Sequence, residues 1–407
     1  MDLHTGSLLW PNTFPEFPVY PVLESDIECE VLIIGGGSAG ALMAYELTQH
    51  GVDTVLIDKR NISGGTSCAN TGLLQFASDK HLTACMHTYG VDKGIRLYQL
   101  CKDAINELEQ ITSMLEIDSK FVRRSSLYFS SCQEHLPLLK AEFAALIELG
   151  IDAIYLEEEQ ISKLYSFRKS GAILSNNDAE VNPFRMVHAL IHHANQKGMR
   201  VYEQTEVLRQ SYKQNTIIFH LKNQRTIRAR KAIFATGYET QSFKKNPNAV
   251  MSSSYVLATQ PLSEFPGWPD RCLIWETARP YLYIRTTLDN RIIIGGLDEA
   301  TKIPAERDAR LLHKKDLLLL EIQKLFPGLP ALKAEHYWAA TFGGTHDGFP
   351  MFGPQAGYPH CYFILGYGGN GTVYNKIAAK IIAGLILNGS HPDAELFRFD
   401  RSPSSGV

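Results

Sequence analysis

The chain has 407 residues, of which 44% are hydrophobic and 20% are charged, so it is long enough for a globular protein of about two to three domains. Its 40 basic and 43 acidic residues give a formal net charge of −3, which argues against a nucleic-acid-binding protein because such proteins cluster positive charge. The chain has no apolar run of about 18 residues, no basic and apolar leader, and no CxxC spacing among its seven cysteines. We therefore expect a cytoplasmic protein without a transmembrane segment, a disulfide framework or a metal site.

The predicted elements begin after a proline-rich arm at residues 1–28, which shows no periodicity and is expected to lie extended over the fold. Residues 30–59 then contain a continuous apolar run, a glycine-rich loop, a helical period that ends at Gly51, and a second apolar run. Continuous apolar runs are typical of strands that are buried on both faces. This segment therefore predicts a buried strand, a glycine loop, a helix and a second buried strand.

The rest of the chain alternates between helical and strand-like patterns. Periodicity predicts helices at 92–118, 136–150, 184–198 and 308–326, and strands within 123–131, 200–237 and 250–297. Asp289 and Asn290 predict the turn of a hairpin in the last of these segments. A strand, a glycine loop and a helix follow over residues 361–389.

Three glycines in the first loop have the GxGxxG spacing of a phosphate-binding turn. Gly35 permits a tight turn, Gly37 lets the backbone approach a pyrophosphate, and Gly40 lets the helix pack on the strand. The N-terminus of the helix offers free N–H groups to the phosphates. Asp58 ends the second strand, where an acid can accept hydrogen bonds from ribose hydroxyls. The complete unit predicts a dinucleotide site rather than a turn without a ligand.

Two features favour FAD over NAD as the dinucleotide. The segment after Asp58 is a loop rich in small and hydroxyl side chains, where an NAD enzyme would continue with another strand and helix. A second glycine loop, residues 366–372, enters the C-terminal helix. A helix N-terminus at this place can hold the flavin end and stabilise negative charge on it.

The ordered set of blocks resembles the D-amino-acid-oxidase superfamily of FAD-dependent oxidoreductases, which includes glycine oxidase, sarcosine oxidase and glycerol-3-phosphate dehydrogenase. The resemblance extends from about residue 30 to residue 401 and is nearest to bacterial members without an assigned substrate. Five blocks carry it: VLIIGGGSAGALMAYEL…VLIDK, SGGTSCANTGLLQ, AEVNPFRMVHALIHHANQKGMRVYEQTEV, ARKAIFATGYE, and THDGFPMFG…GYGGNGTVYNKIAAKIIAGLI.

The resemblance implies an α/β fold, α+β overall, in which a Rossmann-like FAD-binding domain and an antiparallel-sheet substrate domain are interleaved along the chain. The FAD-binding domain would comprise residues 1–90, 180–240 and 345–407, and the substrate domain residues 91–179 and 241–344. FAD would be bound non-covalently, because the place of the flavin-linking cysteine of sarcosine oxidase relatives holds Gly343 and Gly344. The expected cofactor-binding residues are Gly35, Gly37, Ser38, Ala39, Gly40, Asp58, Lys59, Thr66, Ser67, Asn70, Thr71, Gly72, Val207, Ala235, Thr236, Gly237, Gly366, Gly368, Gly369, Asn370, Gly371 and Thr372.

The resemblance also implies the chemistry and a set of substrate-site candidates. In such flavoproteins a hydride passes from the carbon next to an amine nitrogen to flavin N5, the imine product hydrolyses, and oxygen or another acceptor takes the electrons. The expected substrate is a small amine or amino acid. The candidates for the catalytic site are Arg285, as a carboxylate anchor, together with His346 and Tyr255, and Tyr283, Trp338 and Tyr367 as further aromatic neighbours.

Phe342 occupies the position where glycine oxidase carries a carboxylate-binding arginine. Because Phe cannot replace a bidentate ion pair, either carboxylate recognition has moved or the substrate is not a small α-amino acid. This departure favours an aliphatic amine or an N-substituted amino acid.

Other functions stay open on the sequence alone. One is dehydrogenation of a 2-hydroxy acid or a polyol on the same scaffold, and another is an FAD-binding accessory or assembly protein without turnover. His188, His192 and His193 lie at helical spacing without further ligands, which favours a solvent-facing helix surface over a metal site. The sequence does not determine the substrate, the electron acceptor, the choice between oxidase and dehydrogenase, or the oligomeric state.

Overall fold

Parallel strands form the centre of the first sheet, as the buried apolar runs predict. A computed structural model describes residues 2–401 of the chain. In spatial order, the parallel strands are β18 (Tyr358–Leu365), β11 (Thr226–Phe234), β2 (Ile27–Ile34), β3 (Thr54–Ile57) and β8 (Arg200–Tyr202). The antiparallel strands β17 (Met351–Gln355), β10 (Thr216–Leu221) and β9 (Val207–Lys213) extend this sheet.

Both faces of the parallel sheet are covered. Val31 and Ile33 of β2 pack into the core formed with the helices α1 (Ser38–Gln49), α6 (Pro183–Gln196), α9 (Gly371–Asn388) and α3 (Val91–Met114). Leu32, whose side chain points the other way, belongs to the core beneath β10. All three side chains are completely buried, which explains the unbroken apolar run.

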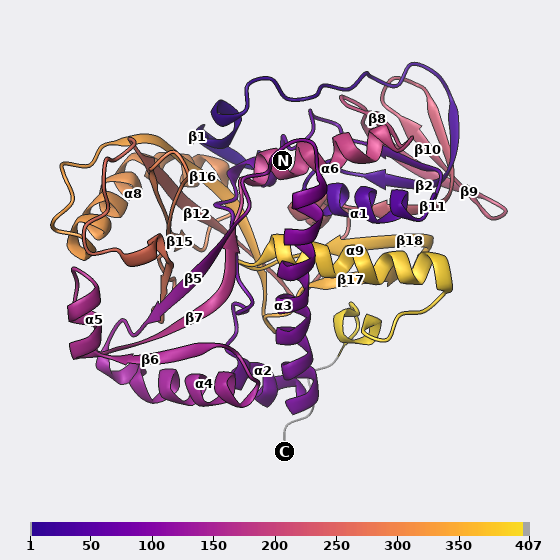
Figure 1. Cartoon of the computed structure of the whole chain (residues 1–407). Helices are drawn as coiled ribbons and strands as arrows, with labels where there is room; N and C mark the ends of the chain where they lie inside the picture. The colour runs from indigo at the N-terminus through magenta and orange to yellow at the C-terminus, as the bar shows by residue number, and fades with distance from the viewer. Residues whose placement is uncertain (1, 402–407) are drawn as a thin grey trace.

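The second sheet is almost entirely antiparallel and lies beside the first (Figure 1). In spatial order it contains β1 (His4–Ser7), β16 (Ala334–Thr345), β12 (Ala249–Thr259), β15 (Ile292–Glu299), β14 (Tyr283–Thr286), β13 (Leu273–Glu276), β5 (Val122–Phe129), β7 (Gly171–Glu180) and β4 (Leu73–Leu74), with β6 (Ala153–Glu157) also paired to β7. Only β13 and β5 run parallel among the described strands of this sheet. The expected hairpin is present, because β14 and β15 pair antiparallel.

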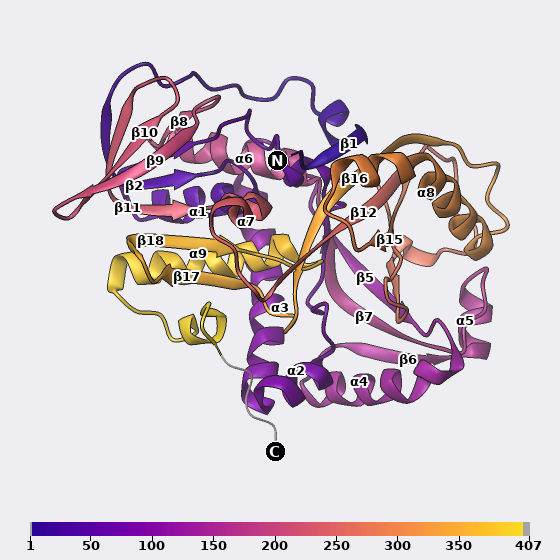
Figure 2. The same ribbon diagram turned by 180° about the vertical axis from the view of Figure 1, so that it is seen from behind.

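Helices pack against the second sheet. The helix α8 (Pro304–Leu325) packs on β12, β15 and β16, α4 (Leu136–Glu148) and α5 (Glu158–Leu164) pack on β6 and β7, and α2 (Leu82–Tyr89) packs on α3 and α4 (Figure 2). The short helix α7 (Thr240–Phe243) follows β11. Within residues 2–401, no helix combines the length and the apolar character that a bilayer span requires.

The chain passes repeatedly between the two sheets. The strands β1, β4 to β7 and β12 to β16 belong to the second sheet, while β2, β3, β8 to β11, β17 and β18 belong to the first. This arrangement confirms the mixed fold class with interleaved parallel and antiparallel sheets. The strands β1 and β4 fall within residues 1–90, which were expected in the FAD-binding domain, yet they pair with β16 and β7 of the second sheet.

Two segments differ from their sequence-based descriptions. Part of the proline-rich arm is an integral edge strand, because β1 pairs with β16 from His4 to Ser7. The expectation of a solvent-facing His188 is wrong, since its side chain is completely buried. The aromatic rings of Phe14 and Phe17, contributed by the arm, cover it together with Phe184. The periodicity of α6 alone could not reveal that a distant segment lies on this face.

Candidate active site

A cavity of about 580 Å³ is lined by residues of both sheets. Its walls come from the loops at the carboxyl ends of β2, β3, β11 and β18, and from β12, β15, β16 and the segment around β14. The carboxyl edge of a parallel sheet is where open α/β folds bind their ligands. The cavity therefore joins the expected dinucleotide site to the second sheet.

The β2–α1 loop forms a narrow cradle at this cavity. Gly35 has a φ of +114° and a Cβ there would overlap the carbonyl oxygen of Ala235, so the turn requires glycine. A Cβ on Gly37 would approach the Ser67 hydroxyl to 2.8 Å and enter the cavity wall. The first turn of α1 begins directly behind this loop, and its backbone N–H groups suit a phosphate. Glycines at these positions leave space for a pyrophosphate, and larger side chains would fill that space.

Asp58 closes the cradle on the β3 side. Its carboxylate accepts hydrogen bonds from the backbone N–H groups of Gly36, at 2.6 Å, and Arg60, at 2.7 Å. Burial raises the pKa of Asp58 to about 6. Beside it, burial opposes the ionisation of Glu239, but bonds from Arg60 and Lys59 hold the pKa of Glu239 at about 2. This end of the cavity is consequently rich in paired charges.

The second glycine loop lies at another part of the same cavity. The helix α9 starts at Gly371. The N–H groups of Gly368 and Gly369 donate to the carbonyl of Gly343, at 2.8 Å, and to Asp79, at 2.7 Å. Asn370 is not among the lining residues, and its side chain exchanges hydrogen bonds with the backbone of Gln75. The loop is thus held in place by residues that the sequence did not point to.

Most of the expected cofactor-binding residues meet at this cavity. Its lining includes Gly35, Gly37, Ser38, Ala39, Asp58, Lys59, Thr66, Ser67, Asn70, Thr71, Val207, Ala235, Thr236, Gly237, Gly366, Gly368, Gly369, Gly371 and Thr372. Gly40, Gly72 and Asn370 stand behind the wall. A Cβ on Gly40 would overlap the Gly35 carbonyl, so this glycine serves the packing of α1. Contact between these residues and the cofactor stays a prediction.

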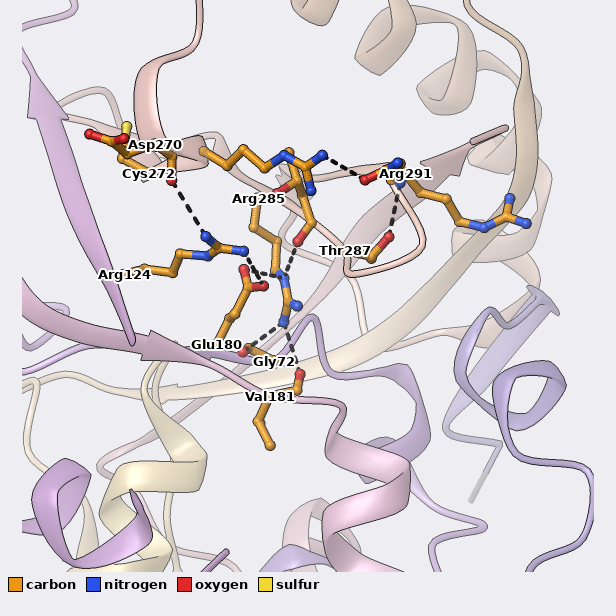
Figure 3. A network of polar contacts seen from close by, with 12 residues as sticks. Gly72, Arg124, Glu180, Val181, Asp270, Cys272, Arg285, Thr287 and Arg291 are labelled. Carbon is orange, nitrogen blue, oxygen red and sulfur yellow. Dashed lines mark hydrogen bonds and ion pairs between the residues drawn. The ribbon is translucent and has the colours of Figure 1, made fainter. Parts of the chain in front are cut away.

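The structure does not bring Arg285 to the cavity. The side chain is 2% exposed, and its guanidinium donates to the carbonyls of Thr71, Gly72 and Val181 at 3.2, 2.9 and 2.8 Å. Figure 3 shows it approaching the carboxylate of Glu180, which Arg124 also reaches. Because its donors are occupied by the chain itself, Arg285 is a structural clamp on the loop that faces the cavity rather than a free carboxylate anchor.

The other two catalytic candidates, Tyr255 and His346, also lie outside the lining of the cavity. Tyr255 is completely buried among the core residues beneath α8, where its hydroxyl donates to the carbonyl of Arg307 at 3.4 Å. His346 is exposed and is absent from the lining of the cavity. Of the further aromatic candidates, Trp338 is buried, and its indole donates to the carbonyl of Ala69 at 2.9 Å. Tyr283 and Tyr367 do line the cavity.

The wall formed by the second sheet contains residues that sequence reasoning missed. Beside Tyr283, the lining includes Ser254 of β12, Asp298 of β15 and Tyr281 just before β14, and also Tyr238, which follows β11 of the first sheet. The hydroxyls of Ser254 and Tyr283 are 3.1 Å apart. The alternation in the segment YLYIR could have signalled that Tyr281 and Tyr283 face one side. No local pattern distinguishes Asp298 from a surface acid, because its position depends on how β15 is paired.

Charge is distributed unevenly along the cavity. Among the described lining residues, the basic ones are Lys59, Arg60 and Arg209, which belong to the dinucleotide end. Phe342 of β16 lines the cavity at the second-sheet wall, and none of the described lining residues on this wall is basic. This wall consequently offers hydroxyls, aromatic rings and a carboxylate instead.

Comparison with known proteins agrees with this geometry. Residues 30–385 match the DAO family, which is described as FAD dependent oxidoreductase. The chain is 24% identical over 410 residues to gamma-glutamylputrescine oxidoreductase of Escherichia coli (strain K12), with 98% of this chain and 91% of that protein covered. It is 22% identical over 369 residues to glycine oxidase of Bacillus subtilis (strain 168), with 88% and 93% covered.

A solved structure has the same architecture. The crystal structure of L-proline dehydrogenase from P. horikoshii aligns with a TM-score of 0.77 at 19% identity, covering 92% of this chain and 97% of that chain. The family match covers most of the chain, from the first glycine loop to the helix behind the second. The chain therefore belongs to the DAO family of FAD-dependent oxidoreductases.

Proposed function

We propose that this protein oxidises the carbon–nitrogen bond of an amine or amino acid, with FAD as its non-covalent cofactor. The observation that carries the proposal is the cavity itself, which joins the glycine cradle at Gly35 and Gly37 to a polar and aromatic wall of the second sheet. One end thus suits the cofactor, and the other end suits a small substrate.

The residues of this chain would bind, orient and exclude water. When bound, FAD accepts a hydride at N5 from the carbon next to the substrate nitrogen. The cradle and the first turn of α1 would hold the pyrophosphate, and the loop before α9 would hold the flavin end. The wall at Tyr238, Tyr281 and Tyr283 would orient the amine and shield it from solvent. The imine product would hydrolyse in water, and oxygen or another acceptor would take up the electrons.

An amine without an α-carboxylate is supported over a small α-amino acid. Phe342 stands at the wall where a carboxylate-binding arginine would be needed, and Arg285 is occupied by backbone carbonyls. One relative is named for gamma-glutamylputrescine and another for glycine, so the test includes both amines and α-amino acids.

The test is anaerobic mixing of the FAD-loaded protein with a panel of compounds. The panel contains aliphatic amines, N-substituted amino acids, α-amino acids, 2-hydroxy acids and polyols, and loss of the flavin absorption band is followed. We expect amines to bleach the band at the highest second-order rate. Bleaching by 2-hydroxy acids or polyols alone would replace the proposal with the alcohol-oxidising alternative. FAD uptake without bleaching by any compound would favour an accessory protein.

A further inference from the structure

Asp298 stands at a bulge that directs it to the cavity. The pairing of β15 with β12 shifts register across Gly296–Glu299, where β15 carries one extra residue. Gly296 has a φ of +135°, and Leu297 has a φ of +54°, a region that such side chains seldom adopt. Bulges re-aim neighbouring side chains and occur next to active sites. The backbone strain therefore coincides with the placement of a carboxylate in the cavity wall.

One oxygen of this carboxylate lacks a partner. The Oδ1 atom of Asp298 is buried and makes no hydrogen bond with the described residues. Burial raises the pKa of Asp298 to about 6, although the Ser254 hydroxyl beside it favours the charged form. A cationic group beside this carboxyl would favour its ionised form. A buried charged oxygen without a donor is costly, so a donor that enters the cavity would stabilise it.

The neighbouring carboxylate of Asp79 differs from that of Asp298, because both of its oxygens accept hydrogen bonds from the chain. Asp79 accepts the Tyr281 hydroxyl at 3.2 Å on one oxygen and the N–H of Gly369 at 2.7 Å on the other. Asp79 is thus satisfied by the chain and holds the loop before α9. Asp298 has no corresponding partner for Oδ1, which sets it apart as the acceptor open to a ligand.

The cations near this wall are engaged elsewhere. Lys314 donates to the carbonyl of Leu297 at 3.0 Å and pairs with Glu299 at 2.6 Å. Arg279 is exposed, donates to the backbone carbonyls of Glu276, Ala278 and Asp79, and places its guanidinium 4.9 Å from the centroid of the Tyr281 ring. The ring of Tyr283 lines the same part of the cavity, and aromatic faces attract cations. The wall is therefore built to accept positive charge.

We propose that Asp298 binds a cationic nitrogen of the substrate that is not the nitrogen undergoing oxidation, so that the substrate class is diamines and other amines with a second cationic group. This proposal rests on the proposed function. The reacting nitrogen must be neutral to release a hydride from its neighbouring carbon, and an adjacent carboxylate would favour its protonated form. A carboxylate is therefore better suited to a distal ammonium group, which it would hold while the other end reaches the flavin.

The experiment uses two matched probes and two readouts on the FAD-loaded protein. The first readout is the second-order rate of anaerobic flavin bleaching by 1,4-diaminobutane and by butylamine, which differ in the distal ammonium. The second readout is the dissociation constant of tetramethylammonium, which has no lone pair on nitrogen and reports binding without turnover, measured from the shift of the flavin spectrum. The variants are Asp298→Asn, which keeps the shape of the side chain, and Asp298→Glu, which keeps its charge. The control is Glu299→Gln, because Glu299 pairs outside the cavity with Arg310 and Lys314.

We expect the wild-type protein and Glu299→Gln to prefer the diamine by about 30-fold or more, as for an ion pair shielded from water. Asp298→Asn should abolish this preference and weaken tetramethylammonium binding by about 10-fold or more, whereas Asp298→Glu should retain part of both. The inference is overturned if Asp298→Asn keeps the diamine preference, or if the wild-type protein favours butylamine. If no amine bleaches the flavin, the proposed function fails, and unchanged tetramethylammonium binding in Asp298→Asn would still refute the role of Asp298 independently.

Discussion

Replacing His188 with leucine should stabilise the protein, and more strongly in mild acid. The His188 ring lies in an aromatic cluster, with centroid distances of 4.5 Å to Phe184, 4.7 Å to Phe17 and 6.1 Å to Phe14. Neither ring nitrogen has a hydrogen-bond partner among the described residues, and burial lowers the pKa of His188 from 6.5 to about 4. The folded protein thus keeps a neutral imidazole that its surroundings do not satisfy.

The magnitude follows from proton linkage. The pKa of His188 is lower in the folded state than in the unfolded state, so the unfolded chain binds more protons as the pH falls below 6.5. Between pH 7 and pH 5 this difference removes about 2 kcal/mol from the free energy of unfolding. Leucine does not titrate, and it also removes two unsatisfied polar atoms, which is worth about 1 to 3 kcal/mol at pH 7. His188→Leu should therefore be more stable at pH 7 and gain about 2 kcal/mol more at pH 5.

Urea unfolding of both proteins at pH 7 and pH 5, at one fixed FAD concentration, measures this difference. The same substitution at His50, which is exposed after α1, controls for the loss of one histidine. Titration of the imidazole by NMR gives an independent value for the folded state. If wild type and His188→Leu lose the same free energy of unfolding between the two pH values, the linkage argument is refuted.

Two further predictions concern the glycine cradle and the buried Arg285. Gly37→Val should lower FAD content at least about tenfold and leave the far-UV circular dichroism unchanged, because the valine side chain would meet Ser67 and fill the cradle. The control Gly328→Ala, which has space around it, should bind FAD normally. Normal flavin content in Gly37→Val would contradict the role of the cradle. Arg285→Met should lower the midpoint temperature of thermal unfolding, since breaking a buried ion pair costs about 3 to 5 kcal/mol and leaves Glu180 with one cation fewer. An unchanged midpoint temperature would argue against Arg285 as a structural clamp.

The sequence predicted the first sheet, and it named residues that the fold gathers around one cavity, because both signals are local. The turn at Gly35, the cradle at Gly37 and the acid at Asp58 lie within one strand–loop–helix–strand unit, so spacing alone identifies them. The continuous apolar run of β2 likewise signals burial on both faces, which the structure confirms. The C-terminal glycine loop is recognisable for the same reason, since a strand and a helix flank it directly.

The second-sheet wall of the cavity depended on tertiary structure, since its residues come from strands that meet only after folding. Arg285 was a reasonable anchor by its position on β14, but the loop at Gly72 and the end of β7 close over its guanidinium. Asp298 had no signal of its own, because the bulge in β15 exists only against β12. The sequence by itself thus pointed to the family and the cofactor, since the motifs that carry the resemblance and the glycine loops are short and local. Only the tertiary structure decided which side chains of the second sheet line the cavity, since strand pairing and coverage by distant segments set the direction and burial of each one.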